Sequence, residues 1–173
     1  YDPFFLAHET GDSHPENSQR LEMMHTYVSA APQAGSLLSV SSREASREQL
    51  CYVHTPRYVE SIEAECGAGF HCIDNFDTMV CEQSFNVARR AVGGVLEMCD
   101  YIVGGEIVNG FCAIRPPGHH AESDTSSGFC LVNNIAIAAR YLQLVHGIGR
   151  VAIIDWDVHH GNGTQQIFEE DPS

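Results

Sequence analysis

LVNNIAIAARYLQLVHGIGRVAIID, residues 131–155, contains the strongest secondary-structure pattern in the chain. Residues 131–147 carry apolar side chains at helical spacing and end at Gly147, which predicts a helix. Residues 150–155 form a continuous apolar run that predicts a buried strand. A second apolar run, 110–114, precedes the helix and predicts another strand. The order strand, helix, strand is typical of two parallel strands joined by a right-handed crossover, so we expect an α/β fold.

The first half of the chain is predicted to be helical. The three expected helices begin near Asn17, Thr55 and Ser84 and end before Pro32, near Cys66 and at Gly104–Gly105. Asparagine, threonine and serine are good N-caps, and Pro56 stands at the first helical position, which tolerates its missing N–H. We expect all three helices to be scaffold rather than site.

Composition narrows the class of protein. The 173 residues are 43% hydrophobic and 18% charged, enough for one sizeable core, so a single domain over 1–173 is expected. Asp and Glu number 23 against 9 Lys and Arg, a formal net charge of −14 with the ten His neutral. This balance argues against nucleic acid and suits cationic partners. No apolar run could span a bilayer and no signal peptide is recognisable, so we expect no membrane partner and a cytoplasmic location.

Cysteine usage agrees with an intracellular protein. The seven cysteines are odd in number, widely spaced and contain no CxxC pair. This pattern fits neither a disulfide framework nor a cysteine-rich zinc knuckle. We expect most of them to be small buried hydrophobic residues.

Polar clusters follow both predicted strands. RPPGHHAESDTSSGF (115–129) comes after the first strand, and DWDVHHGNG (155–163) runs off the end of the second. Ligands in open α/β sheets bind beyond the carboxyl ends of the strands. The predicted topology therefore brings two histidine pairs to one edge of the sheet.

The second cluster suggests a metal site. Asp155, Asp157 and His159 alternate with three apolar residues, so in an extended segment they share one face at steps of about 6–7 Å. Such groups beside a buried strand are costly to desolvate unless something compensates them. Carboxylate and imidazole ligands suit zinc, which usually takes three or four protein ligands. The alternative is a histidine satisfied by a neighbouring aspartate in a turn; the converging second histidine pair favours the metal.

The first cluster suggests proton transfer. Pro116 and Pro117 stiffen the loop and Gly118 permits close backbone approach, so His119 and His120 are expected in fixed positions. Imidazole titrates near neutral pH. A fixed pair can therefore take a proton from a metal-bound water and return it to a leaving group.

Three motifs in this order and spacing resemble the zinc-dependent histone deacetylase family, on the side of the class II deacetylases and the bacterial acetylpolyamine amidohydrolases. They are RPPGHHA (115–121), GFCLVNN (128–134) and DWDVHHGNGTQ (155–165). Weaker similarity extends upstream to HETGDSHPENSQRL (8–21), VHTPRYVESI (53–62) and DTMVCEQSFNVARRAVGG (77–94). The resemblance implies a three-layer α/β/α, arginase/deacetylase-like fold with a mainly parallel sheet.

The resemblance also implies Zn²⁺ as cofactor. Asp157 and His159 match two of the family's three zinc ligands. The third ligand, another Asp, and the transition-state tyrosine lie downstream of DVHHGNG in the family, whereas this sequence stops at Ser173. We therefore expect the amino-terminal portion of one deacetylase domain, truncated after the DxH motif. It would be a fragment of a longer product, a chain completed by a segment from another chain, or a degenerate noncatalytic protein.

Catalytic roles follow from the same resemblance. His119 and His120 match the paired active-site histidines, and His120 is the better candidate for the general base. Asp155 matches the carboxylate that orients His119. Asn162 stands where class I enzymes have Asp and class II enzymes have Asn, a difference that changes the proton affinity of His120.

Substrate contacts can be assigned in the same way. Gly128 and Phe129 match the wall of the narrow channel that admits an acetyl-lysine side chain. Asp77 matches a rim carboxylate that holds the substrate backbone. Arg20 matches a buried arginine near the product exit, with structural burial of its stem as the alternative.

The implied function is zinc-dependent hydrolysis of the acetyl amide of acetyl-lysine or of an acetylpolyamine, releasing acetate. The sequence leaves the choice of acetylated substrate and the oligomeric state open. Two rivals remain. One is a noncatalytic acetyl-ligand-binding protein, favoured by the missing third ligand. The other is a metallophosphoesterase, which also uses a DxH step but needs downstream Asn and His ligands, and the chain has no GNH motif.

Overall fold

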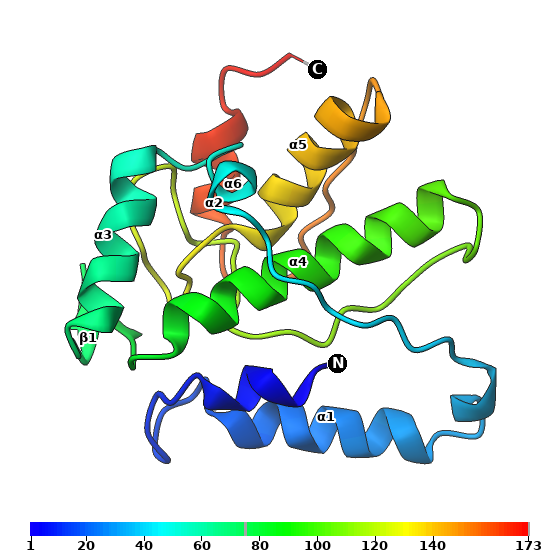
Figure 1. Cartoon of the computed structure of the whole chain (residues 1–173), viewed down its shortest axis with the longest axis horizontal. Coiled ribbons are helices and arrows are strands. Elements are labelled where there is room, and N and C mark those ends of the chain that lie inside the picture. Colours follow the sequence, from blue (N-terminus) through cyan, green and yellow to red (C-terminus); the bar gives the residue numbers. More distant parts are fainter. Residues whose placement is uncertain (75, 173) are drawn as a thin grey trace.

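Helices form most of the regular structure in the computed structural model, which describes residues 1–74 and 76–172 (Figure 1). In chain order the elements are η1 (Pro3–Ala7), α1 (Ser18–Ala30), η2 (Ala34–Ser36), α2 (Arg47–Leu50), α3 (Pro56–Gly67), β1 (Cys72–Ile73), β2 (Thr78–Met79), α4 (Ser84–Val103), α5 (Asn134–His146) and α6 (Asn162–Phe168). Four long helices, α1, α3, α4 and α5, match those predicted from the sequence.

Local capping explains where three of these helices begin. The side chains of Asn17, Thr55 and Asn133 each accept a hydrogen bond from a backbone N–H in the first turn of α1, α3 and α5, respectively. α5 ends at Gly147, whose φ of 68° lies in the left-handed region that glycine tolerates best. The predicted start of α3 at Thr55–Pro56 and the predicted end of α5 are confirmed.

The start of α4 differs from the prediction. Ser84 is the first helical residue rather than the cap, and Gln83 in the cap position makes no side-chain capping bond. The Ser84 hydroxyl instead accepts a hydrogen bond from Cys81 N–H at 2.8 Å and lies 2.7 Å from Nδ1 of His8. The Ser84 hydroxyl, which was predicted to cap the helix, therefore contacts His8 instead.

α4 is the centre of the core. Its residues Ala88, Val92 and Leu96 pack in one apolar cluster with α3 and α5, while Val87 and Ala91 pack in a second cluster with η1 and α1. All five side chains are at most 1% exposed. Figure 1 shows α4 lying between α5 and α1. One helix thus joins two apolar clusters.

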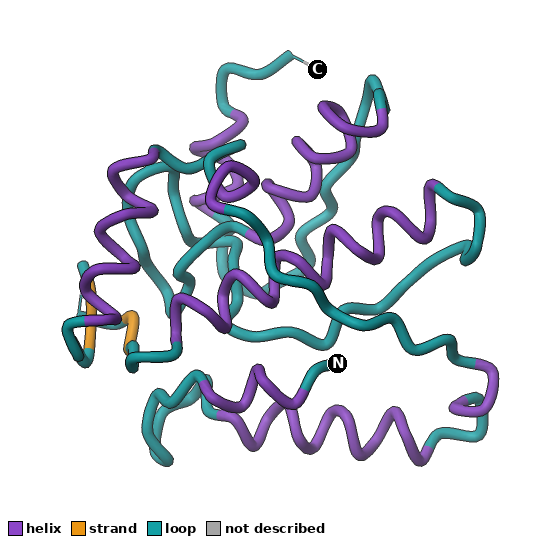
Figure 2. Tube along the Cα trace, viewed as in Figure 1, coloured by secondary structure: helices purple, strands orange, loops and turns teal. Residues whose placement is uncertain are grey.

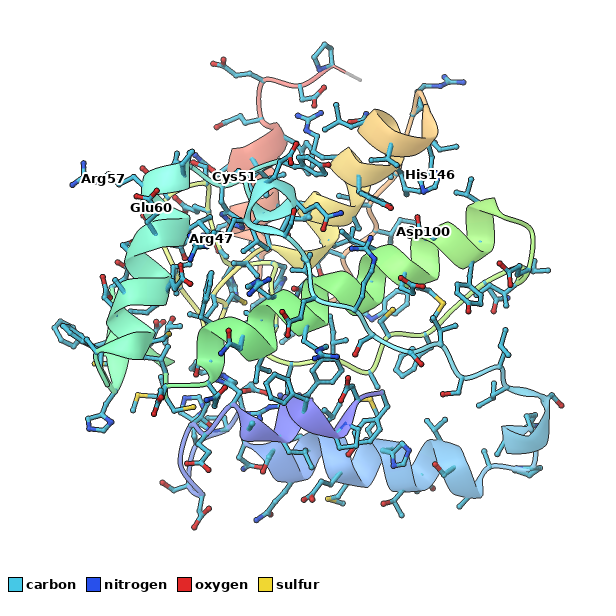
Figure 3. The ribbon with its side chains drawn as sticks, viewed as in Figure 1. Arg47, Cys51, Arg57, Glu60, Asp100 and His146 are labelled. Carbon is cyan, nitrogen blue, oxygen red and sulfur yellow. The ribbon has the colours of Figure 1, made fainter. Side chains whose placement is uncertain are left out.

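Polar contacts add to the packing of α4 against α5. Asp100 on α4 accepts hydrogen bonds from the Tyr141 hydroxyl at 2.8 Å and from His146 Nε2 at 2.7 Å (Figure 3). Arg43, in the segment before α2, lies 3.6 Å from the other carboxylate oxygen of Asp100. These contacts fix the carboxyl-terminal ends of the two helices relative to each other.

The predicted parallel sheet is not formed in the described part of the chain. Its one sheet is the antiparallel pair β1–β2 (Figure 2). In this pair Cys72 lies opposite Met79. Residues 110–114 and 150–155, predicted as parallel strands, run as loop. Phe111 and Ile154 in these segments are 66% and 82% exposed. A strand needs a neighbouring strand to hydrogen-bond with. An apolar run indicates that a segment is suited to burial, but it does not provide that neighbour.

All seven cysteines are free thiols; Cys66 and Cys130 are buried and the other five are partly buried, so full burial holds for fewer than expected. None of the helices in the described ranges is both long and apolar enough to cross a membrane.

Candidate active site

Two loops bring the predicted histidine pairs together. His119 Nδ1 lies 2.8 Å from Oδ2 of Asp155, and His120 Nδ1 lies 2.6 Å from Oδ1 of Asn162. The imidazole rings of His119 and His120 have centroids 4.1 Å apart. The convergence expected from the order of the motifs is therefore present, although the two strands that were expected to position the loops are not.

The loop that carries the two histidines is fixed between α5 and α6. A Cβ on Gly118 would lie 2.7 Å from the backbone nitrogen of Asn134, so the predicted close backbone approach is confirmed. On the other side, Thr164 N–H donates a hydrogen bond to the carbonyl of His119 at 3.2 Å. The helix that provides this contact, α6, begins at Asn162 itself and was not among the predicted helices.

The two predicted metal ligands are adjacent. Oδ1 of Asp157 lies 3.0 Å from Nδ1 of His159 and accepts a hydrogen bond from the His159 backbone N–H at 2.7 Å. Two atoms bound to one zinc ion at about 2.0–2.1 Å with tetrahedral geometry lie about 3.3 Å apart, so the donor types and their spacing fit zinc. Within residues 1–74 and 76–172, no group of three or more His, Cys, Asp or Glu side chains is arranged to hold a metal. Asp157 and His159 are thus two candidate zinc ligands, and their 3.0 Å contact is also the one expected of a histidine satisfied by a neighbouring aspartate in a turn.

Both aspartates of this segment have lowered pKa values. For Asp157 the main cause is the hydrogen bond from the backbone N–H of His159. Partial burial raises the pKa of Asp155, but hydrogen bonds from His119 and from the backbone N–H of Asp157 outweigh it and hold that pKa below its ordinary value. The Asp157 and His159 side chains are 48% and 73% exposed, so the desolvation expected for this segment is not observed. At neutral pH both aspartates are anionic and can bind or stabilise a positive charge.

Gly128, one of the residues assigned to the substrate channel, lies beside His120. A Cβ on Gly128 would lie 2.2 Å from Cδ2 of His120, and the φ of Gly128 is 54°. Any side chain at this position would displace the imidazole. Asp77 accepts a hydrogen bond from the Gly128 N–H at 3.1 Å, so the carboxylate assigned to substrate here holds the chain's own loop. The ring of Phe129 meets the edge of His14, with centroids 4.6 Å apart.

The burial expected for Arg20 is not observed. Arg20 is exposed on α1, whereas Arg115, at the start of the histidine loop, is 2% exposed. Its guanidinium donates to both carboxylate oxygens of Glu16, at 2.9 and 3.0 Å, and to the backbone carbonyls of Phe5, His8 and Glu16. In the sequence, the one sign that Arg115 is buried is its position between an apolar run and the Pro-Pro-Gly turn, where the chain leaves the interior.

Comparison with known proteins agrees with the motifs. The family model for the histone deacetylase domain matches residues 14–173. Human polyamine deacetylase HDAC10 is 42% identical over 141 residues, covering 79% of this chain and 21% of that protein. Human histone deacetylase 9 is 33% identical and covers the whole chain, using 20% of its own length. The uncharacterized protein slr0245 of Synechocystis is 42% identical over 178 residues, covering 99% of this chain and 57% of that protein.

The fold is shared with a solved deacetylase domain. The crystal structure of the HDA15 HD domain superposes with a TM-score of 0.91 and 37% sequence identity, covering 98% of this chain and 48% of that one. The chain thus spans less than three fifths of the length of each of these relatives. With the family model matching nearly all of its length, the chain belongs to the histone deacetylase family and has the deacetylase fold over the matched part.

Proposed function

We propose that the protein containing this chain hydrolyses the acetyl amide of an acetylated amine and releases acetate. The observation that carries the proposal is the pair of histidines, His119 and His120, each held at Nδ1 by an oxygen atom and lying in the same site as His159. An imidazole fixed at Nδ1 presents Nε2 for proton transfer. Fixed imidazoles next to a metal-ligand pair suit amide hydrolysis, in which a water must lose a proton and the leaving amine must gain one.

Zn²⁺ is the proposed cofactor, with Asp157 and His159 as two of its ligands. Their donor types and the 3.0 Å separation of their ligand atoms support this assignment. When bound, zinc polarises an acyl carbonyl and lowers the pKa of water. The remaining protein ligand would come from a further part of a longer protein or from another chain.

The two histidines are proposed to divide the proton transfers. His119 faces the carboxylate of Asp155, which stabilises a positive charge on the ring, whereas His120 faces the uncharged amide of Asn162. A neutral His120 can accept a proton at Nε2 from the attacking water. A protonated histidine then donates to the leaving amine, and Gly128 leaves room for the His120 ring in this position.

The proposed substrates are acetyl-lysine side chains and acetylpolyamines. The relatives include proteins named as histone deacetylases and as polyamine deacetylases. Lysine side chains and polyamines are both cationic once deacetylated, and a chain with a formal net charge of −14 attracts cations. The choice between the two classes is made by measuring acetate release from each.

His120→Ala is expected to lower acetate release by about a hundredfold while zinc binding is retained, because it removes the proposed base and leaves both proposed metal ligands in place. The measurement is acetate production from an acetyl-lysine peptide and from an acetylpolyamine by the longest natural product that carries this chain, with zinc counted per chain. His25→Ala, on the exposed face of α1, is the matched control. Unchanged activity in His120→Ala would exclude the proposed role.

A noncatalytic acetyl-ligand-binding protein is the second candidate. It is favoured by the finding that the described residues contain no group of three or more His, Cys, Asp or Glu side chains arranged to hold a metal. Binding of an acetyl-lysine peptide to the zinc-loaded wild type without any acetate release would select this candidate over the hydrolase.

We also propose that residues 110–114 and 150–155 become strands of a parallel sheet in a three-layer α/β/α domain once their neighbours are present. Their apolar runs and the exposure of Phe111 and Ile154 support this. Amide hydrogen exchange at 151–154 is expected to slow at least about tenfold in a longer natural product compared with the 173-residue chain. Amides of 92–96 in α4 serve as the control, and equal exchange at 151–154 in both proteins would contradict the proposal.

A further inference from the structure

The side-chain amide of Asn162 is held at both ends. Its Oδ1 lies 2.6 Å from Nδ1 of His120, and its Nδ2 donates a hydrogen bond to Oε1 of Glu122 at 3.0 Å. A carboxylate can only accept hydrogen bonds, whereas an amide has one accepting and one donating end. The end that faces Glu122 is therefore the nitrogen, and the end that faces His120 is the oxygen.

The orientation of this amide determines which ring nitrogen of His120 carries the hydrogen. With Oδ1 facing the ring, Nδ1 must donate, so the hydrogen is on Nδ1 and the lone pair is on Nε2. With the amide reversed, Nδ2 would donate to Nδ1 and the hydrogen would move to Nε2. Only the first arrangement leaves Nε2 able to accept a proton from water.

The neighbouring histidine needs no such selection. His119 faces Asp155, whose two carboxylate oxygens both accept hydrogen bonds, so either end of the carboxylate gives the same tautomer. A neutral amide partner brings a two-way ambiguity that a carboxylate partner lacks. Glu122 removes this ambiguity for Asn162, because the reversed amide would place its oxygen against the Glu122 carboxylate.

Glu122 is itself firmly held. Its backbone N–H donates to the carbonyl of Thr125 at 3.0 Å, and its carbonyl accepts a hydrogen bond from Nδ1 of His54 at 2.9 Å. His54 is 2% exposed, and its Nε2 accepts a hydrogen bond from the Asn133 N–H at 2.9 Å. The backbone that carries the Glu122 carboxylate is thus tied to a buried ring and to the start of α5.

We propose that Glu122 is a positioning residue that acts through Asn162 to keep His120 in the tautomer with hydrogen on Nδ1 and a free lone pair on Nε2. The catalytic consequence rests on the proposed deacetylase function. The tautomer itself does not depend on that function, so it can be measured without any turnover.

The test is the tautomer of His120 in the 173-residue, zinc-free chain, read from its ring ¹⁵N chemical shifts at about pH 8.5, where imidazole groups are ordinarily neutral. The wild type is expected to carry the hydrogen on Nδ1. In Glu122→Gln the partner can present either end of its amide, and the ratio of the two tautomers is expected to fall by about tenfold. The double variant Glu122→Gln/Asn162→Asp exchanges the donor and acceptor and is expected to restore the wild-type tautomer. Glu63→Gln, which removes an exposed carboxylate paired with Arg47, is the control for loss of charge and is expected to change nothing.

Two results would overturn the proposal: hydrogen on Nε2 in the wild type, or an unchanged tautomer in folded Glu122→Gln. The first result comes from the wild type, so it can be obtained even if the variant fails to fold. In a longer product that releases acetate, Glu122→Gln is expected to lower kcat about tenfold with KM unchanged. If that wild-type product releases no acetate, the proposed function fails while the ¹⁵N result still decides the role of Glu122.

Discussion

Arg115→Met is expected to lower the free energy of unfolding by about 3–5 kcal/mol, because it leaves a buried carboxylate without its partner. Arg115 is 2% exposed and Glu16 is 4% exposed, and the guanidinium satisfies both carboxylate oxygens as well as three backbone carbonyls. The methionine keeps the apolar stem, so the loss reports on the charged group rather than on packing. Urea unfolding followed by circular dichroism at pH 7 measures the change.

Two further variants separate the buried pair from a general effect of losing an arginine. Arg115→Met/Glu16→Met removes both charges and is expected to be less destabilised than the single variant, since no unpaired charge remains. Arg47, which is labelled in Figure 3, forms an exposed ion pair with Glu63. Arg47→Met removes this pair, and an effect below about 1 kcal/mol is expected. If Arg115→Met changed stability no more than Arg47→Met, the network would contribute little to folding, and Glu16 would have to be protonated or hydrated in the variant.

The helices could be predicted where their starts are encoded within one turn. Thr55 and Asn17 cap α3 and α1 through their own side chains, so the local pattern is sufficient. α6 was missed because Gly161 in its cap position makes no side-chain bond. Ser84 misled the prediction because its hydroxyl bonds a neighbouring backbone N–H and contacts His8, 76 residues away in the sequence.

The strands were the least predictable elements because a strand depends on its neighbours. The apolar run at 150–155 indicates that the segment suits burial on both faces, but nothing in the run specifies which segment lies beside it. In the described part of the chain that neighbour does not appear, and Trp156, the residue directly after this run, is 92% exposed. Helices avoid this difficulty because their backbone partners are four residues away.

The site was predictable to the extent that its chemistry lies in short motifs. The pairs His119–Asp155 and His120–Asn162 follow from motif resemblance and are confirmed by their 2.8 and 2.6 Å contacts. The supporting residues could not be found in this way. Glu122 meets Asn162 across 40 residues of sequence, and Arg115 meets Glu16 across 99, so no spacing rule links either pair. The residues proposed to react were visible in the sequence, whereas the residues that hold them required the fold.

Lowering the pH from 7 to 5 is expected to reduce the free energy of unfolding by about 4 kcal/mol, with two buried histidines as the cause. Burial lowers the pKa of His8 to about 3 and that of His54 to about 4, from an ordinary value of 6.5. At pH 5 both are neutral in the folded chain and protonated in the unfolded chain. The unfolded state therefore binds more protons, and stability falls as the pH drops below about 6.5, by about 2 kcal/mol for each histidine at pH 5.

The pH range from 7 to 5 separates the loss of stability due to the buried histidines from any loss due to the carboxylates. Asp2, Asp155 and Asp157 have lowered pKa values, so their stabilising contribution is present above the ordinary value of 3.8 and is lost only below it. Urea unfolding at pH 7, 6 and 5 therefore isolates the histidines. His54→Gln can still donate to the Glu122 carbonyl and accept from Asn133 N–H, and it is expected to remove about half of the pH-dependent loss. His25→Gln, on the exposed face of α1, is expected to leave the loss unchanged. A loss that began only below about pH 4 would assign the acid sensitivity to the carboxylates, because buried neutral histidines must be protonated on unfolding at any pH between 4 and 6.5.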